Sequence, residues 1–412
     1  MKWIPIDRPL LIPEKAKSIL QKLSGASYVS YCVGGCVRDH LLGRTPKDID
    51  IVTSATPDQI LELFPSANPI GKAFGVMQVE GYEVATFRKD GTYIDSRHPE
   101  SVEFSNPEED AKRRDFTVNG FFYDLKTNRI LDYVSGFEDI RDKKIRAIGS
   151  APQRFQEDAL RLLRAIRFAA QVGFEIENET LRSIKNRAKL IKRISGERVR
   201  DELERMWIGA APDIAAQYLV ETELGAILFP EIEAAHWEGL VRLFQKIKAL
   251  GEPKSAILGW AALTRDQKGH PQAIAGSLMQ RMKLSNAQFE SLQWILEERT
   301  KFKEVFLMRE ATLSRWISHP GFEFLLQFHW CEAMSSDGNL IYHEFCESRL
   351  RDLRSQAGGW LPKLIDGKDL IGLGLSPGPE FTEILKTVED LALEKKITTK
   401  EQALEYVLKH FC

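Results

Sequence analysis

Two aspartates, Asp48 and Asp50, stand one residue apart in the stretch GGCVRDHLLGRTPKDIDIV, residues 34–52. On a β-strand alternate side chains project to the same face, so the two carboxylates would point together while Ile49 and Ile51 point to the packed side. Neighbouring carboxylates repel each other unless a cation lies between them. Oxygen ligands favour hard ions, and Mg²⁺ is the usual one where phosphates complete the coordination shell. The pair is therefore a candidate metal site, and two such ions would suit in-line nucleotidyl transfer.

The glycine pair that opens this stretch could approach a phosphate. Gly34 and Gly35 can bring backbone N–H groups close to phosphate oxygens, and Arg38 stands at the start of the predicted helix that follows. The next glycine is Gly43, so the dinucleotide-binding pattern G-x-G-x-x-G is absent, and the P-loop lysine is missing as well. Taken alone, the two aspartates could also be inert acids on a solvent-facing edge strand.

A second motif, EEDAKRRDFTVNG (residues 108–120), places Arg113, Arg114 and Asp115 directly before a predicted strand that begins near Asn119. Guanidinium groups at the entrance of a strand can clamp phosphates, and arginine has the geometry for it. The alternative is a solvated helix end that carries the same charges.

A third motif, RFQEDALRLLRAIRF (residues 154–168), repeats charged residues every three positions on what we expect to be one helix: Asp158, Arg161, Arg164 and Arg167. Aspartate can accept a hydrogen bond from the exocyclic amine of C or A, and arginine can donate to a ring nitrogen or carbonyl. Such a pair could select C and A over G and U without a nucleic-acid template. The alternative is an amphipathic helix with surface pairs worth about 0.2–0.5 kcal/mol each.

Together the three motifs resemble the signature of the nucleotidyltransferases that repair or build tRNA 3′ ends, and of the related bacterial poly(A) polymerases. In that family the glycine turn holds the triphosphate and the Asp-x-Asp pair binds the catalytic metals. The resemblance implies nucleotide contacts at Gly35, Arg38 and Arg114, Mg²⁺ ligands at Asp48 and Asp50, a third acid at the metal centre at Asp115, and base reading by Asp158 and Arg161 with support from Arg164 and Arg167.

The resemblance also implies a reaction: template-independent addition of C, C and A to the tRNA 3′ end from CTP and ATP, with release of pyrophosphate. Three alternatives remain open. A poly(A) polymerase would use the same chemistry, and a partial enzyme would add only CC or only the final A, with differences in the loop near Gly91–Pro99. An RNA-binding protein with an inactive head would be a different class, but the retained Asp48, Asp50, Asp158 and Arg161 argue against it.

The elements that must position these residues change character along the chain. Alternating apolar patterns predict strands over residues 28–33, 48–52, 75–79, 82–88, 101–104, 119–123 and 130–132, with helices at 14–23, 37–42 and after Thr56-Pro57. From Pro152 onward helical periodicity dominates. We therefore expect an α+β fold: a nucleotidyltransferase head with a small mixed sheet and flanking helices (1–150), then an all-α neck with the base-selecting motif (151–235), body (236–355) and tRNA-binding tail (356–412).

Composition narrows the class of protein. Hydrophobic content of 43% and charged content of 28% are ordinary for a globular protein, and no apolar run approaches the ~20 residues of a membrane span. We expect a cytoplasmic protein without a membrane or an evident protein partner. The net charge is −2, yet residues 181–200 hold eight Lys/Arg against the single acid Glu197. This basic stretch is the first candidate for tRNA contacts, although a solvated helix face would look the same.

Overall fold

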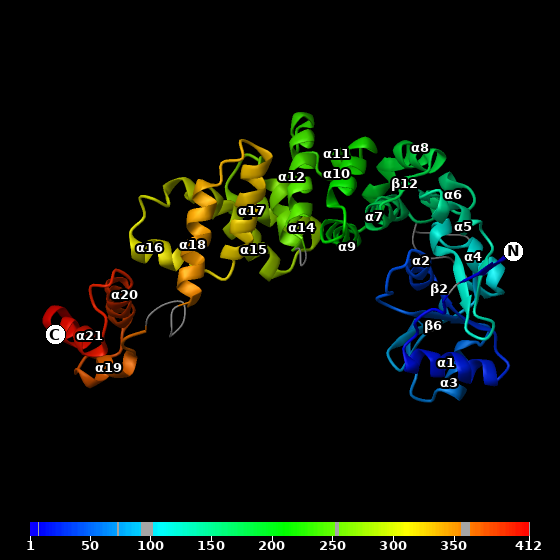
Figure 1. The fold of residues 1–412 in the computed structure, drawn as a ribbon, viewed down its shortest axis with the longest axis horizontal. Helices are drawn as coiled ribbons and strands as arrows, with labels where there is room; N and C mark the ends of the chain where they lie inside the picture. The colour runs from blue at the N-terminus through cyan, green and yellow to red at the C-terminus, as the bar shows by residue number, and fades with distance from the viewer. Residues whose placement is uncertain (7, 72–73, 92–101, 252–254, 356–362, 412) are drawn as a thin grey trace. The chain divides into compact units, whose positions relative to one another are not determined.

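The structure, a computed structural model, divides into two units, residues 1–234 and 235–412 (Figure 1). It describes the whole chain except residues 7, 72–73, 92–101, 252–254, 356–362 and 412. Residues 92–99 of the loop that distinguishes full from partial enzymes therefore lie outside the described part. The finer division into head, neck, body and tail stays a prediction.

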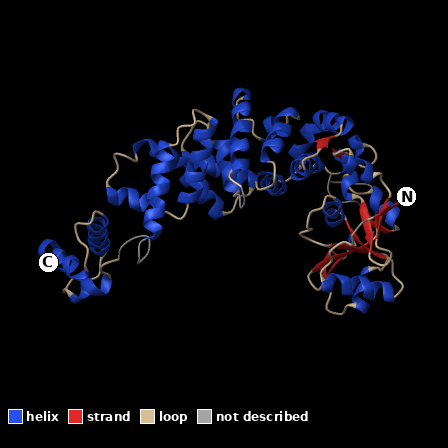
Figure 2. Cartoon of the chain, in the orientation of Figure 1, coloured by secondary structure: helices blue, strands red, loops and turns tan. Residues whose placement is uncertain are grey.

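The first unit contains a sheet whose strands are red in Figure 2. It has eight strands in the order β1-β10-β9-β2-β3-β6-β5-β4. β3 and β6 pair in parallel, whereas the other neighbours pair antiparallel, so the predicted mixed sheet is confirmed. The strands are β1 (Lys2–Pro5), β2 (Ser30–Val33), β3 (Asp50–Thr53), β4 (Asn68–Gly71), β5 (Val76–Val79), β6 (Tyr82–Thr86), β9 (Phe121–Asp124) and β10 (Arg129–Asp132). β7 (Arg88–Asp90) and β8 (Val102–Phe104) form a separate antiparallel pair.

Two helices cover one face of this sheet. α1 (Glu14–Gly25) and α3 (Pro57–Leu63) bury Leu20, Leu23 and Ile60 in the same apolar cluster as Ile51 of β3 (Figure 1). α3 begins as predicted, since the Thr56 side chain and the Gln59 side chain form a reciprocal capping box at its N-terminus. A smaller cluster on the opposite face includes Val33, Val52 and Phe122.

Several predicted strand boundaries were wrong, because a strand extends only as far as its neighbouring strand pairs with it. β3 begins at Asp50 and leaves Asp48 before the strand, because β2 ends at Val33, the partner of Asp50, and Gly34 turns away with a φ of 78°. β9 begins at Phe121 and not near Asn119, after a 3₁₀ turn, η2 (Thr117–Asn119). β1 and β4 were not predicted; both are short edge strands that contain proline, which weakens a strand pattern.

The rest of the first unit is helical, apart from a short parallel pairing of β11 (Lys144–Ile145) with β12 (Glu175–Ile176). We expected the third motif to form one helix, but it forms two. α6 ends at Glu157, Asp158 is extended with φ −142° and ψ 105°, and α7 begins at Arg161. The helices are α4 (Pro107–Lys112), α5 (Gly136–Arg141), α6 (Ala151–Glu157), α7 (Arg161–Val172), α8 (Asn178–Arg187), η3 (Ala188–Arg193), α9 (Gly196–Trp207), α10 (Pro212–Glu221) and α11 (Leu224–Leu228).

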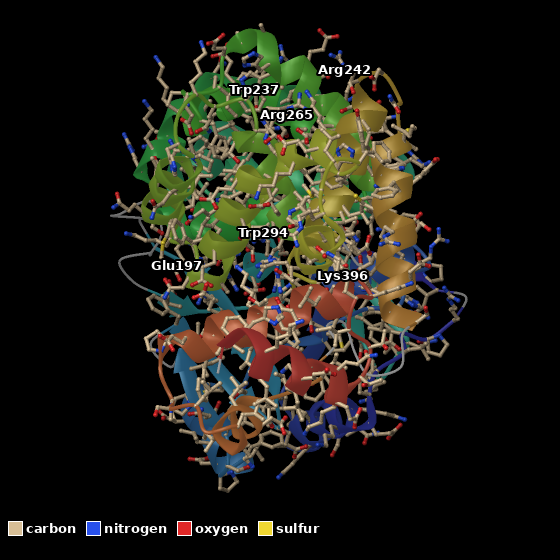
Figure 3. The ribbon with its side chains drawn as sticks, turned by 90° about the vertical axis from the view of Figure 1, so that its left-hand side faces the viewer. Glu197, Trp237, Arg242, Arg265, Trp294 and Lys396 are labelled. Carbon is tan, nitrogen blue, oxygen red and sulfur yellow. The ribbon has the colours of Figure 1, made fainter. Side chains whose placement is uncertain are left out.

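The described part of the second unit is helical throughout, as predicted. Its α-helices are α12 (Trp237–Ala249), α13 (Ala256–Thr264), α14 (Pro271–Met282), α15 (Asn286–Glu298), α16 (Glu310–Ile317), α17 (Phe322–Ser335), α18 (Ile341–Ser355), α19 (Gly367–Gly372), α20 (Pro379–Leu393) and α21 (Lys400–Phe411), with 3₁₀ segments η4 (Ala234–His236) and η5 (Arg299–Glu304). Trp237 and Trp260 are buried in packed helices, while Trp294 stacks on His319. Trp237 and Trp294 are labelled in Figure 3. None of the described helices is long and apolar enough to cross a membrane.

Candidate active site

The glycine turn between β2 and α2 (Gly35–Leu41) lies beside an arginine of the second motif. Gly34 has a φ of 78°, which strongly favours glycine, and its N–H donates to the Phe121 carbonyl at 3.1 Å. A Cβ built on Gly34 would lie 3.5 Å from Nη1 of Arg114. The turn therefore brings the Gly34 backbone close to a guanidinium group.

Asp48 and Asp50 line one cavity of about 670 Å³ at the start of β3. Both residues are exposed, whereas Ile49 and Ile51 are buried, as the alternation predicts. Partial desolvation and the carboxylates of Glu83 and Asp48 raise the pKa of Asp50, against the opposing charge of Arg114. The cavity thus concentrates negative charge at the two predicted metal ligands.

Glu83 is a site residue that the sequence prediction missed. It lines the same cavity and directly precedes Val84, the partner of Ile51 in the parallel pairing of β3 with β6. An acid near the start of the predicted strand 82–88 was a visible signal, but the pattern alone does not say which strand is its neighbour. Among the described residues, no three His, Cys, Asp or Glu side chains meet at metal-ligand spacing, so Glu83 does not complete a three-carboxylate site.

A buried carboxylate, Asp110 of α4, holds both arginines of the second motif. Its Oδ1 accepts from Nε of Arg113 at 2.8 Å, and its Oδ2 accepts from Nη2 of Arg114 at 2.9 Å. Burial alone would raise the pKa of Asp110, but the two guanidinium groups outweigh it and lower the pKa. Arg113 and Arg114 are therefore anchored in the head and are not a freely solvated helix end.

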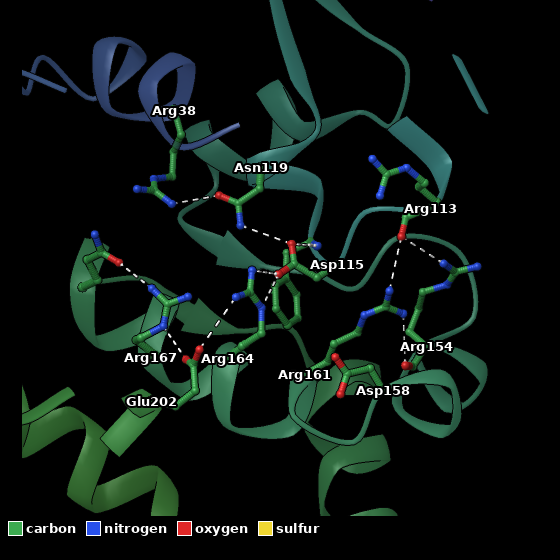
Figure 4. Close-up of polar contacts among 12 residues, drawn as sticks. Arg38, Arg113, Asp115, Asn119, Arg154, Asp158, Arg161, Arg164, Arg167 and Glu202 are labelled. Carbon is green, nitrogen blue, oxygen red and sulfur yellow. Dashed lines mark hydrogen bonds and ion pairs between the residues drawn. The ribbon is translucent and has the colours of Figure 1, made fainter. Parts of the chain in front are cut away.

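Asp115 lies against an arginine of the third motif. Its Oδ2 accepts from Nε and Nη2 of Arg164 at 2.8 and 2.6 Å (Figure 4). Burial would raise its pKa, but the charge and hydrogen bonds of Arg164 outweigh burial and lower the pKa to about 2. These contacts fix Asp115 beside α7, and its role as a third acid at the metal centre stays a prediction.

Three arginines contact the aromatic ring of Phe168. The guanidinium carbons of Arg38, Arg164 and Arg167 lie 5.4, 5.2 and 4.0 Å from its centroid. Glu202 of α9 holds two of them, with an Oε2 to Nε distance of 2.5 Å to Arg167 and an ion-pair distance of 3.7 Å to Arg164. α7 therefore lies against the start of α2 within the first unit.

Asp158 and Arg161, the predicted base readers, have separate partners at the break between α6 and α7. Asp158 accepts from the Leu160 N–H at 3.0 Å and from Nη2 of Arg198 at 2.9 Å. Arg161 pairs with Glu157 at 2.8 Å and donates to the backbone carbonyl of Arg113 at 3.3 Å. The Asx-type contact to Leu160 explains why the helix breaks here.

Two family matches and a set of full-length relatives agree with this geometry. Residues 30–146 match the Poly A polymerase head domain, and residues 173–236 match the probable RNA and SrmB-binding site of polymerase A. A CCA-adding enzyme of Lactobacillus helveticus is 32% identical over 418 residues, covering 98% of this chain and 99% of the relative. The chain belongs to the CCA-adding enzyme family. This confirms the nucleotidyltransferase class inferred from the three motifs.

Solved structures support the same assignment. The Bacillus stearothermophilus CCA-adding enzyme in complex with CTP has a TM-score of 0.76 at 31% identity, covering 97% of this chain and 98% of that one. A Thermotoga maritima CCA-adding enzyme complexed with tRNA shares the fold, with a TM-score of 0.68 at 20% identity and 98% coverage of both chains. The expected arrangement of an α+β head followed by helices is thus confirmed.

Proposed function

We propose that Asp48 and Asp50 form the catalytic centre at which this enzyme adds C, C and A to tRNA 3′ ends from CTP and ATP. The reaction joins the terminal 3′ oxygen to the α-phosphorus of the nucleotide and breaks the bond from that phosphorus to the oxygen of the departing pyrophosphate. One observation carries the proposal: in a member of the CCA-adding family, both carboxylates line a single cavity, and Asp50 pairs across the sheet with Val33, the residue directly before the glycine turn.

Mg²⁺ fits the donor set of this cavity. Asp48 and Asp50 offer exposed carboxylate oxygens, and two protein ligands leave room for phosphate oxygens and water, as Mg²⁺ commonly requires. When bound, Mg²⁺ would activate the attacking hydroxyl and neutralise charge on the phosphates. The side chain of Glu83, on the neighbouring strand, adds to the negative potential that attracts a cation.

The triphosphate would lie between the glycine turn and the arginines around it. Gly35 offers backbone close to the phosphates, and Arg114 contributes a fixed charge that also acts on Asp50. Arg38 is 3% exposed and lies under the turn, since a Cβ on Gly35 would lie 3.7 Å from its Nη2. Arg38 therefore supports the phosphate site from below.

Base selection is assigned to the end of α6 and the start of α7. The Asp158 carboxylate accepts from the exocyclic amine that C and A share, and Arg161 donates to a ring acceptor. Arg164 and Arg167 would support these two residues. Their own positions are fixed by contacts with Asp115, Glu202 and Phe168.

Incorporation of single nucleotides tests this function. Transcripts of tRNA that end at the discriminator base, at C or at CC are incubated with the protein, Mg²⁺ and labelled CTP or ATP given singly. We expect C on the first two transcripts and A only on the third. Long A tails would indicate a poly(A) polymerase, CC without A a partial enzyme, and no labelling of any transcript would refute the enzyme assignment.

The metal assignment predicts the effect of removing one carboxylate charge. D48N and D50N should each reduce incorporation at least about 1,000-fold, because a metal ligand is removed, while tRNA binding changes less than about twofold. Incorporation and filter binding are measured in parallel. D142N, a change at an exposed acid of the head, is the matched control and should keep full activity; D48N activity close to that control would remove the assignment.

A further inference from the structure

Asn119 lies between two groups of the site and has no role in the assignments above. Its Oδ1 accepts from Nη1 of Arg38 at 2.8 Å, and its Nδ2 donates to Oδ1 of Asp115 at 3.3 Å (Figure 4). Asn119 is 7% exposed, Asp115 is 8% exposed and Arg38 is 3% exposed. All three side chains are therefore shielded from water. A hydrogen bond that is lost among them is hard to replace, because no water molecule takes its place.

The amide of Asn119 satisfies both neighbours at once. A guanidinium group needs an acceptor and a carboxylate needs a donor, and the side chain of asparagine carries one of each on the same carbon. This requirement also fixes the orientation of the amide, with its oxygen toward Arg38 and its nitrogen toward Asp115. A carboxylate at this position would face Asp115 as a like charge. An aliphatic side chain would leave Nη1 of Arg38 and Oδ1 of Asp115 without this bond, while Arg38 would keep Asp39 and Asp115 would keep Arg164.

The bridge completes a continuous polar chain between the two ends of the nucleotide site. It runs from Arg38 under the glycine turn through Asn119 to Asp115, and from there to Arg164 on α7. The ring of Phe168 gives a second, apolar link between the same arginines.

We propose that Asn119 is a positioning residue that holds Arg38 under the glycine turn, at a fixed position relative to the Asp115–Arg164 pair, whose arginine belongs to α7. The proposal rests on the proposed function, in which Arg38 serves the triphosphate and Arg164 supports the base. Asn119 acts through Arg38 and touches no substrate, so its removal affects nucleotide binding for CTP and ATP alike.

The N119L variant keeps nearly the same size and removes both hydrogen bonds. We expect the KM for CTP and for ATP to rise about 10-fold or more, with a smaller change in kcat, since the two hydrogen bonds position a binding group. T53V is the matched control: it removes a buried hydroxyl that donates to the Val29 carbonyl elsewhere in the sheet, and should lower the melting temperature without changing either KM. If N119L fails to fold, N119A repeats the test with room for a water molecule.

A double-mutant comparison with R38M separates positioning from general destabilisation. If Asn119 acts through Arg38, adding N119L to R38M should change each KM by less than about twofold, because the group that it positions is already gone. An unchanged KM in N119L, or independent effects that multiply in the double variant, would overturn the proposal. A wild-type KM in R38M alone would instead refute the role of Arg38 in the proposed function.

Discussion

Carboxylates of the same chain hold the arginines of the candidate site in place. The pairs are Arg38–Asp39, Arg114–Asp110, Arg161–Glu157, Arg164–Asp115, Arg167–Glu202 and Arg198–Asp158. Long flexible side chains lose conformational entropy when they order on binding, and these pairs supply that order in the folded protein. The site therefore presents donors at fixed positions, which favours selection between bases of similar size.

Removing the carboxylate of Asp158 should weaken the choice of nucleotide more than the rate. We expect D158A to reduce the preference for CTP over UTP, and for ATP over GTP, about 10-fold to 100-fold, because one directed hydrogen bond is removed. Ratios of kcat/KM for the four nucleotides measure the effect. D201N, at a half-exposed acid of α9, is the control, and a preference in D158A equal to that of D201N would contradict base reading by Asp158.

The Asp115–Arg164 pair should contribute stability that disappears in acid. The folded pKa of about 2 lies below the unfolded value near 3.9, so the contribution is present above about pH 4 and is lost as the pH falls toward 2. We expect D115N to lower the free energy of unfolding by about 2 kcal/mol at pH 6. Urea titrations at several pH values should show the difference between wild type and D115N shrinking from pH 5 downward; a constant difference would mean that the ion pair is not its cause.

At the scale of elements, the residues proposed for base selection and metal binding lie at a helix end and just before a strand. Asp158 is extended between α6 and α7, where its carboxylate is not confined to a helix face and can meet Arg198 of α9. Asp48 likewise precedes β3, where neither neighbouring strand covers it. The proposed metal-binding and base-selecting carboxylates thus lie where the regular backbone pairing of an element stops.

The packing of α17 against α18 should make the second unit sensitive to acid. His329 stacks on Phe302 of η5 at 3.7 Å, and desolvation together with the neighbouring His343 of α18 lowers its pKa to about 4. A base whose folded pKa lies below its unfolded value near 6.5 gives stability that is present above about pH 6.5 and is lost as the pH falls toward 4. Glu344 and Glu347 of α18 act on His343 in the opposite direction.

We expect the free energy of unfolding of the second unit to fall by about 2–3 kcal/mol between pH 7 and pH 4 from this histidine alone, since partial exposure screens some of the effect. H329F should remove most of that dependence, because a phenylalanine keeps the stacked shape and does not titrate. Tryptophan fluorescence during urea unfolding reports the transition. H410Q, at an exposed histidine of α21, serves as control, and an H329F profile that matches the control would refute this origin.

Over the whole molecule, the net charge is slightly negative, whereas one local segment is strongly basic. The chain carries a net charge of −2, but Lys189, Lys192 and Arg193 are exposed in the basic stretch of η3. This segment lies inside the match to an RNA-binding family region at residues 173–236. The basic stretch is therefore the proposed phosphate-binding surface for tRNA.

Removing charge from this surface should weaken tRNA binding uniformly. We expect the double change K189Q/K192Q to lower the affinity and to reduce the slope of log affinity against log salt by about 0.7–0.9 for each phosphate that the variant no longer neutralises. Binding is measured between 50 and 200 mM salt, as is usual for such slopes. K15Q/K126Q removes the same charge from exposed sites of the head, and an equal effect of the two changes would argue against a specific surface.

The sequence by itself determined the features that depend on neighbours along the chain. The Asp-x-Asp alternation, the cap at Thr56, the glycine turn and the helical second unit follow from side-chain type and short-range periodicity, and the three motifs were enough to indicate the family. The tertiary structure alone decided which distant segments meet. Parallel pairing of β3 with β6 brings Glu83 to Asp50, the packing of α7 near the second motif gives Asp115 to Arg164, and the packing of α9 at the break between α6 and α7 gives Asp158 to Arg198. Periodicity tells which face a side chain occupies, but the partner across that face is set by topology, which a local pattern does not encode.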